Sequence, residues 1–355
     1  MSVLLGAGTS CAAGLPDVNG LLKQVLSDLT GEELALATDL YQERNLEEGL
    51  TRLRRIRGLL GDSEESFAGF TAKSAESLEG GISARIIQAL STSDFSQEPS
   101  VNFATWAAGD YYTRPLEVFT VNYDLLIEQG LESVGASYFD GFVGNLNARF
   151  RPDLIEPRDL GESLPKSFVR LWKLHGSLNW KVLSDGTVRR TGAAVDQSEV
   201  AAIYPSDDKY NQSRRVPFLV LQDRLRRALA EPESLTLVCG YSFGDDHLNE
   251  ILFDAAKRYP RSEIAVFCYA EIPAKLGIKL PPNLTVYGAE EAIIGGERTK
   301  WCTPNSTNGT NDAVWKNNRF TLGDFVELAQ FLANSRRQGA HWAEFGGAPE
   351  LIPAR

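Results

Sequence analysis

The sequence predicts an α/β fold, namely a Rossmann-like parallel sheet with helices on both faces, plus a helical insertion and a small hairpin-rich module. Short apolar runs alternate with segments of helical periodicity, which is typical of a parallel sheet covered on both sides. A glycine-containing turn directly follows the first apolar run. Polar residues stand at the ends of several later runs, which is where open α/β sheets bind their ligands.

Residues 2–5 form the first apolar run and predict a short buried strand that leads into the glycine turn. A helix is expected from about Leu15. Residues 31–110 have loosely periodic leucines interrupted by turn signals, so they predict a helical insertion between the first two core strands.

The second core strand is predicted at 116–121, where β-branched and aromatic residues dominate. A short helix should follow from Asp124, and residues 140–165 are expected to form a long loop. The other expected elements are strands at 168–174, 235–239, 264–269 and 284–286, a hairpin around Asp185-Gly186, and helices at 216–229, 247–257 and 322–332. This organisation predicts a main domain at 1–290, with the insertion at about 31–110 and the small module at about 140–215, followed by a C-terminal extension at 291–355.

Composition excludes some classes of function. The 355 residues include 36 basic and 47 acidic side chains, giving a formal charge of −11, so direct binding of nucleic acid through bulk charge is not expected. The arginines at 52, 54, 55 and 57 are better explained as a solvated helix face. No apolar run approaches the roughly 18 residues of a membrane span, and the N-terminus lacks a signal-peptide pattern. A cytoplasmic protein is therefore expected.

The four cysteines are far apart, at Cys11, Cys239, Cys268 and Cys302, and no pair has C-x-x-C spacing. Neither a zinc site nor a disulfide framework is expected. Asp245, Asp246 and His247 are adjacent and could suggest a metal cluster. Because neighbouring residues at a helix start diverge in direction, helix capping by either aspartate with a structural His247 is the favoured interpretation.

The glycine turn is the first candidate binding site. It reads Gly6-Ala7-Gly8-Thr9-Ser10, and such a turn before a helix lets the backbone approach a pyrophosphate closely. A plain tight turn is an equal alternative for this pattern. Cys11 occupies the place of the third glycine of a dinucleotide fingerprint.

Two further candidates stand at strand ends. Asn122 follows the second strand and His175 follows the third. Taken alone, Asn122 could cap the next helix, and His175 could be a buried or turn histidine with no chemical role. Considered together with the motifs at 6–17 and 240–242, both are predicted to be catalytic.

Four blocks together resemble the sirtuins. The opening run G-A-G-T-S-C-A-A-G-L-P-D, at 6–17, is similar to the sirtuin opening motif. T-V-N-Y-D at 120–124 resembles the sirtuin T-Q-N-[IV]-D, L-H-G-S at 174–177 resembles the catalytic H-G, and G-Y-S at 240–242 resembles G-[TS]-S. Their local form most resembles the bacterial sirtuin-like NADases of antiphage defence systems.

The resemblance implies an NAD⁺ glycohydrolase that releases nicotinamide and ADP-ribose, with NAD⁺ as substrate and no zinc. It implies three catalytic residues, Asn122, His175 and Asp124. Asn122 would position the ribose or the attacking water, and His175 would be the general base. Asp124 and Asp17 would lie near the nicotinamide pocket. The implied cofactor-binding residues are Gly6, Ala7, Gly8, Thr9, Ser10, Asp17, Thr120, Gly240 and Ser242.

Departures from the sirtuin pattern keep alternatives open. Val18-Asn19 replaces the F-R of deacylases, Val121 replaces a glutamine, and the four-cysteine zinc module has no counterpart. A sirtuin-type deacylase or ADP-ribosyltransferase is one alternative, and a non-catalytic NAD⁺ or ADP-ribose sensor is another. The resemblance also implies a homo-oligomer and restraint by a partner, either a HerA-type ATPase or an Argonaute-type sensor. The segments at 31–110 and 291–355 are the expected interfaces.

Overall fold

The computed structural model describes residues 1–42, 46–61, 63–91, 95–109, 115–155, 165, 168–183, 185–192, 200–202, 216–277, 279–301 and 314–344. The strand, helix and site descriptions below concern these residues. Cys302 lies outside them.

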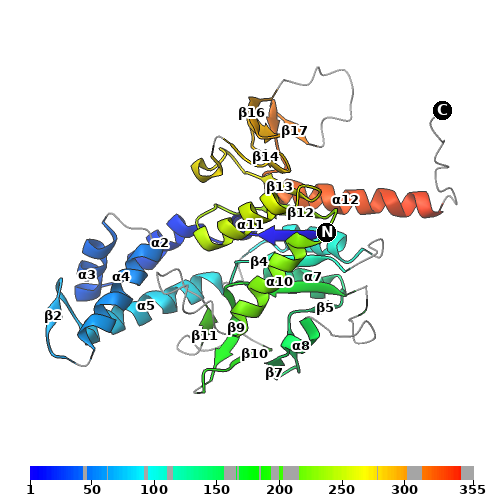
Figure 1. Cartoon of the computed structure of the whole chain (residues 1–355). Coiled ribbons are helices and arrows are strands. Elements are labelled where there is room, and N and C mark those ends of the chain that lie inside the picture. The colour runs from blue at the N-terminus through cyan, green and yellow to red at the C-terminus, as the bar shows by residue number, and fades with distance from the viewer. Residues whose placement is uncertain are drawn as a thin grey trace, which may run out of the picture.

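A large, mainly parallel sheet forms the centre of the molecule (Figure 1). Its strands are β1 (Ser2–Leu5), β4 (Glu117–Thr120), β5 (Tyr138–Phe139), β8 (Val169–Lys173), β12 (Leu235–Cys239), β13 (Glu263–Phe267), β14 (Leu284–Tyr287), β15 (Glu291–Ile294) and β16 (Glu297–Lys300). Within the described residues their order is β16-β15-β14-β13-β12-β1-β4-β8-β5. The strands from β14 to β5 are parallel, and β15 and β16 add an antiparallel edge. The predicted α/β class is confirmed.

Helices cover both faces of this sheet. One face carries α6 (Glu98–Ala107), α7 (Leu126–Ser133) and α12 (Phe325–Glu344), and the other carries α10 (Phe218–Ala230) and α11 (Asp246–Arg258). Side chains of β1 alternate between the two cores, since Val3 and Leu5 join the first and Leu4 joins the second. This burial on both faces explains why Val3, Leu4 and Leu5 are all apolar.

A helical unit with its own core follows β1. It contains α2 (Val18–Ser27), α3 (Gly31–Tyr41), α4 (Leu46–Leu60) and α5 (Ala72–Leu90), with a short hairpin of β2 (Ser66–Phe67) and β3 (Phe70–Thr71). Buried leucines and isoleucines of these helices form a separate cluster, and Figure 1 shows them on the opposite side of the molecule from α12. The helix expected from about Leu15 begins later, at Val18, and a shorter helix, α1 (Ala7–Cys11), precedes it.

A second, antiparallel sheet forms the small module. It contains β6 (Phe142–Val143), β7 (Asn147–Phe150), β9 (Gly176–Val182), β10 (Val188–Thr191) and β11 (Val200–Ala202), in the order β11-β9-β10-β7-β6. The hairpin predicted around Asp185-Gly186 joins β9 to β10.

The long loop predicted at 140–165 is wrong in its first part. There β6 and β7 pair as a hairpin, followed by α8 (Pro152–Ile155). Gly141 and Gly144 have positive φ angles of 91° and 116°. Gly141 lies just before β6 and Gly144 lies in the turn between β6 and β7, where such angles favour glycine. Phe142 and Ala148 bury one face of it against Trp180.

The C-terminal part adds a 3₁₀ turn at Ala274–Leu276 and a small hairpin of β17 (Trp315–Lys316) and β18 (Arg319–Phe320) before α12. The last helix runs to Glu344, which is well past the predicted end at 332. In the described residues, no helix is both long and apolar enough to cross a bilayer.

Candidate functional site

The sequence-predicted site residues gather at one edge of the large sheet. Gly240 follows β12, Gly6 follows β1, and Asn122 and His175 come two residues after the ends of β4 and β8. These four strands are consecutive neighbours, so their carboxyl ends lie side by side. Strand β1 has β4 on one side and β12 on the other, so the chain order reverses here, and such a reversal is the usual binding position of open α/β sheets.

Two glycines let the turn after β1 cross the turn after β12. The Gly6 N–H donates to the Cys239 carbonyl and the Gly8 N–H donates to the Gly240 carbonyl, both at 2.9 Å. A Cβ on Gly6 would lie 2.5 Å from the Gly240 oxygen, and one on Gly8 would lie 2.8 Å from the Gly240 Cα. Close backbone packing therefore requires both glycines, whatever ligand they meet.

The amides of this turn are partly used within the protein. Besides the Gly8 N–H, the Thr9 N–H donates to the Gly6 carbonyl at 3.0 Å. The N–H groups of Gly8 and Thr9 therefore already have acceptors within the protein. Ala7 and Gly8 are exposed, whereas Thr9 and Ser10 are buried, so a ligand would meet the outer side of the turn at Ala7 and Gly8.

Asn122 is tied to this turn by its amide. Its Nδ2 lies 3.0 Å from the Gly6 carbonyl, 3.0 Å from Thr9 Oγ1 and 2.8 Å from Ser10 Oγ. Since the amide has two hydrogens, it is fully engaged as a donor. Ser10 Oγ in turn donates to Asp124 Oδ2 at 2.6 Å. The structure thus joins Asn122 and Asp124 through Ser10.

The helix-cap explanation of Asn122 fails. The N-cap of α7 is Leu125, and Asp124 Oδ1 accepts the Leu126 N–H at 3.1 Å. The backbone N–H of Asn122 donates to Thr120 Oγ1 at 3.1 Å, so the predicted Thr120, which is buried, supports the backbone just before the site.

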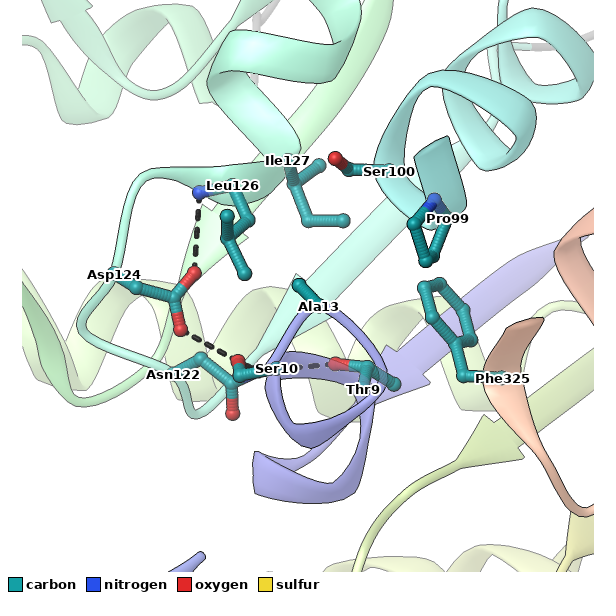
Figure 2. A pocket seen from close by; sticks show the side chains of 10 residues that line it. All are labelled: Thr9, Ser10, Ala13, Pro99, Ser100, Asn122, Asp124, Leu126, Ile127 and Phe325. Carbon is teal, nitrogen blue, oxygen red and sulfur yellow. Dashed lines mark hydrogen bonds between the residues drawn. The ribbon is translucent and has the colours of Figure 1, made fainter. Parts of the chain in front are cut away.

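A small pocket lies next to Asn122 and Asp124 (Figure 2). It has an empty volume of about 230 Å³, including space open to solvent. Figure 2 shows Pro99 of α6 and Phe325 of α12 together on the side away from Asp124. Its lining is Thr9, Ser10, Ala13, Pro99, Ser100, Asn122, Asp124, Leu126, Ile127 and Phe325. His175 does not line this pocket.

A buried lysine braces the loop between Asn122 and α7. Lys173, only 2 % exposed, lies with Nζ 3.0 Å from Glu128 Oε1 and also donates to the Asp124 carbonyl. Burial raises the pKa of Glu128, and the neighbouring Lys173 ammonium opposes that rise. Sequence reasoning missed this pair, although a lysine inside the apolar run FVRLWKL was a usable signal.

His175 lies in the turn between β8 and β9 and is 7 % exposed. Its Nε2 lies 3.1 Å from Asp245 Oδ2. The turn is joined to the Asn122 loop through the Tyr123 carbonyl, which accepts the Leu178 N–H at 3.0 Å. The two catalytic candidates thus stand on neighbouring, connected strand ends. No direct contact between their side chains is found in the described part of the chain.

Asp245 has a second role as the N-cap of α11. Its Oδ1 accepts the N–H groups of His247 at 3.0 Å and Leu248 at 3.2 Å. His247 Nε2 lies 3.1 Å from Gln222 Oε1 and so joins α11 to α10. The predicted capping role and the structural role of His247 are confirmed. The contact of Asp245 with His175 was not anticipated, because the two residues are far apart in the sequence.

The loop from 240 to 245 is held in a special conformation. Gly240 and the fully buried Phe243 have positive φ angles of 62° and 58°. Asn249 Nδ2 donates to the Phe243 carbonyl at 2.9 Å, and the Tyr241 hydroxyl lies 3.0 Å from Asn249 Oδ1. Tyr241 and Asn249, at the two ends of the segment 240–249, therefore stabilise the conformation of this loop. Ser242 is exposed at the surface of the loop.

Asp17 lies at the edge of the site. It is exposed, and its Oδ1 accepts the Gly20 N–H at 2.6 Å as the N-cap of α2. Burial, followed by the charges of Asp17 and Asp124, raises the pKa of the Cys11 thiol. Both carboxylates are therefore within electrostatic reach of Cys11. Across the described ranges, no group of three or more His, Cys, Asp or Glu side chains is arranged to hold a metal ion.

One family model matches part of the chain. Residues 116–279 match the family model of the SIR2-like domain. The match supports a sirtuin-like family, and this SIR2-like segment contains Asn122, Asp124, His175 and Gly240. No curated protein matches the chain in sequence.

Solved structures with a similar arrangement include a Sir2 homologue in complex with NAD, at 15% identity and a TM-score of 0.47, covering 95% of this chain and 89% of that one. A second is a Sir2 homologue in complex with ADP-ribose, at 13% identity and a TM-score of 0.42, covering 96% and 92%.

Proposed function

We propose that this protein is an NAD⁺ glycohydrolase that cleaves the nicotinamide–ribose bond to give nicotinamide and ADP-ribose. One observation carries the proposal: Asn122, Asp124 and His175 stand on the adjacent ends of β4 and β8, beside the Gly6–Ser10 turn, where the strand order reverses. The SIR2-like match over 116–279 supports it.

Cleavage of the nicotinamide–ribose bond does not require a strong general acid. It requires a general base and a water molecule held in position. Glycosyl cleavage passes through an oxocarbenium-like state, and nicotinamide leaves as a neutral pyridine. The Asn122 donors are already engaged, and within the described residues no group donates to its Oδ1. This oxygen is therefore the atom that would accept a hydrogen bond from the attacking water or a ribose hydroxyl.

Asp124 supplies negative charge close to the same place. Its carboxylate is buried, 6 % exposed, and linked to Asn122 through Ser10. A fixed anion stabilises the positive charge that develops on the sugar. His175, on the next strand end, would take the proton of the attacking water.

The resemblance to bacterial sirtuin-like NADases also suggests a cellular role. We propose a cytoplasmic effector of bacterial antiphage defence, acting by abortive infection. It would form a homo-oligomer and be restrained by a HerA-type ATPase or an Argonaute-type sensor. Residues 1–290 would form the catalytic domain, and the insertion at 31–110 and the extension at 291–355 would provide the interfaces.

Nicotinamide release from NAD⁺ by the purified chain tests the activity. We expect release by the wild type, and a loss of about 10²-fold or more in Asn122→Ala and His175→Ala. His247→Gln is a matched control, because that histidine joins α11 to α10 through Gln222 in the described part of the chain. It should stay within about twofold of the wild type in this assay.

Two other results would point elsewhere. Release only when an acyl-lysine peptide or another acceptor is added would indicate a deacylase or ADP-ribosyltransferase. Binding of NAD⁺ by titration calorimetry without turnover, with or without the proposed partners, would indicate a sensor.

A further inference from the structure

The two carboxylate oxygens of Asp245 contact different parts of the chain. Oδ1 accepts the first backbone N–H groups of α11, from His247 and Leu248. Oδ2 lies 3.1 Å from His175 Nε2, and the two side chains are 11 % and 9 % exposed. The carboxylate therefore joins the start of α11 to the turn after β8 in a largely dry environment.

The position of this carboxylate is fixed by its surroundings. The Asp245 carbonyl accepts the Asn249 N–H at 2.9 Å and lies 3.1 Å from the Tyr241 hydroxyl. Tyr241 and Asn249 are themselves buried. Because the backbone of Asp245 is held here and its Oδ1 bonds the first N–H groups of α11, the carboxylate has little freedom and can orient a neighbour.

Nε2 and Asp245 Oδ2 form an ion-pair contact at 3.1 Å. An ionised carboxylate repels a nitrogen lone pair at this distance, so the nitrogen that faces it should carry the hydrogen. In a neutral imidazole, the other nitrogen then has the free lone pair. Among the described residues, His175 Nδ1 has no hydrogen-bond partner. The contact therefore selects the tautomer with Nε2 protonated and Nδ1 available as a base.

We propose that Asp245 is a positioning residue that makes His175 Nδ1 the general base of the reaction; this rests on the glycohydrolase function proposed above. A water proton passes to Nδ1 as the water oxygen bonds to the ribose carbon. The carbon–nitrogen bond breaks, and its electron pair leaves with nicotinamide. Asp245 stabilises the imidazolium that results, which later releases the proton to solvent.

Asp245→Asn separates this role from helix capping. The cap requires an acceptor facing the His247 and Leu248 N–H groups, so the amide oxygen must take that side. Its NH₂ group then faces His175 Nε2 and requires a lone pair there. The substitution should keep the cap and move the imidazole hydrogen to Nδ1.

We expect Asp245→Asn to lower kcat for nicotinamide release by about 10²- to 10⁴-fold, with KM and the midpoint of thermal unfolding little changed. Asp246→Asn is the matched control and should behave as wild type, because that carboxylate is exposed and, among the described residues, pairs with Lys275. Asp245→Ser is a second variant, since serine caps helices well but is too short to reach His175. Full release by Asp245→Ser would overturn the proposal.

A direct measurement of the tautomer makes the test independent of activity. Histidine ¹⁵N NMR, with the His175 signals assigned by their loss in His175→Gln, should show a protonated Nε2 in the wild type and a protonated Nδ1 in Asp245→Asn. The same tautomer in both proteins would overturn the proposal even if NAD⁺ is cleaved. If no NAD⁺ is cleaved but the tautomer inverts, the glycohydrolase function fails while the effect of Asp245 on His175 stands.

Discussion

The two sides of the candidate site are held in different ways. On the Asn122 side, the amide, two hydroxyls and a carboxylate form a continuous hydrogen-bonded group, with Lys173 bonded beneath the loop. On the His175 side, the imidazole has one side-chain partner, Asp245, in the described residues. The Asn122 side is therefore held by several hydrogen bonds. The His175 side chain is held by one ion-pair contact with Asp245 in the described residues.

This difference affects how substitutions should be read. Removing Asn122 breaks contacts that shape the turn after β1, so a loss of activity there combines a structural and a chemical effect. Removing His175 disturbs fewer contacts and reports more directly on chemistry. Measurements of stability beside activity are therefore needed on the Asn122 side.

The largest effect is expected from breaking the brace under the Asn122 side. Lys173→Met should cost about 3–5 kcal/mol of unfolding free energy, because it leaves Glu128 buried without its partner. The double variant Lys173→Met/Glu128→Leu should recover much of this loss. Urea unfolding measures both.

The control for this brace is an exposed pair. Arg226→Met breaks the contact with Asp223. The two side chains are 42% and 51% exposed, so the substitution should lower the unfolding free energy by at most about 1 kcal/mol. Equal costs for Lys173→Met and Arg226→Met would show that the Asn122 side is not braced as described.

A direct comparison of the two candidates should give an intermediate effect. Asn122→Ala removes the amide donor to Gly6, Thr9 and Ser10, so it should lower the unfolding free energy by about 1–3 kcal/mol. His175→Gln keeps a donor able to face Asp245 and should cost less than Asn122→Ala. Both should lose nicotinamide release. An equal loss of stability in thermal unfolding would remove the distinction between the two sides.

The smallest effect is expected at Ser10, the link between Asn122 and Asp124. Ser10→Ala should cost about 0.5–1.5 kcal/mol and reduce nicotinamide release. Ser27→Ala, which removes an exposed hydroxyl bonded to the Gln24 carbonyl, should change neither quantity. Unchanged release in Ser10→Ala would mean that Asp124 does not need this link.

Local patterns predicted the places of the site residues but not their partners. The strand at 235–239 was placed correctly, because a strand buried on both faces is a continuous apolar run. Apolar runs also mark the strands before Asn122 and His175, so the sequence predicts both residues at strand ends. Their catalytic roles stay predictions. The Asp245–His175 contact depends on where the β12 loop comes to lie over β8, and single-sequence periodicity carries no such information. The sequence does not predict the β6–β7 hairpin, because the glycines in and around it give the segment the composition of a loop.

The position of β1 has a consequence for any attempt to isolate the SIR2-like segment. Residues 2–5 pair with both β4 and β12, yet they precede the matched region, which begins at 116. A fragment limited to 116–279 would leave the inner edges of these two strands unpaired and would lack the backbone that crosses Gly240. The smallest autonomous unit must therefore be discontinuous in sequence, joining the N-terminal strand to a body that starts more than a hundred residues later.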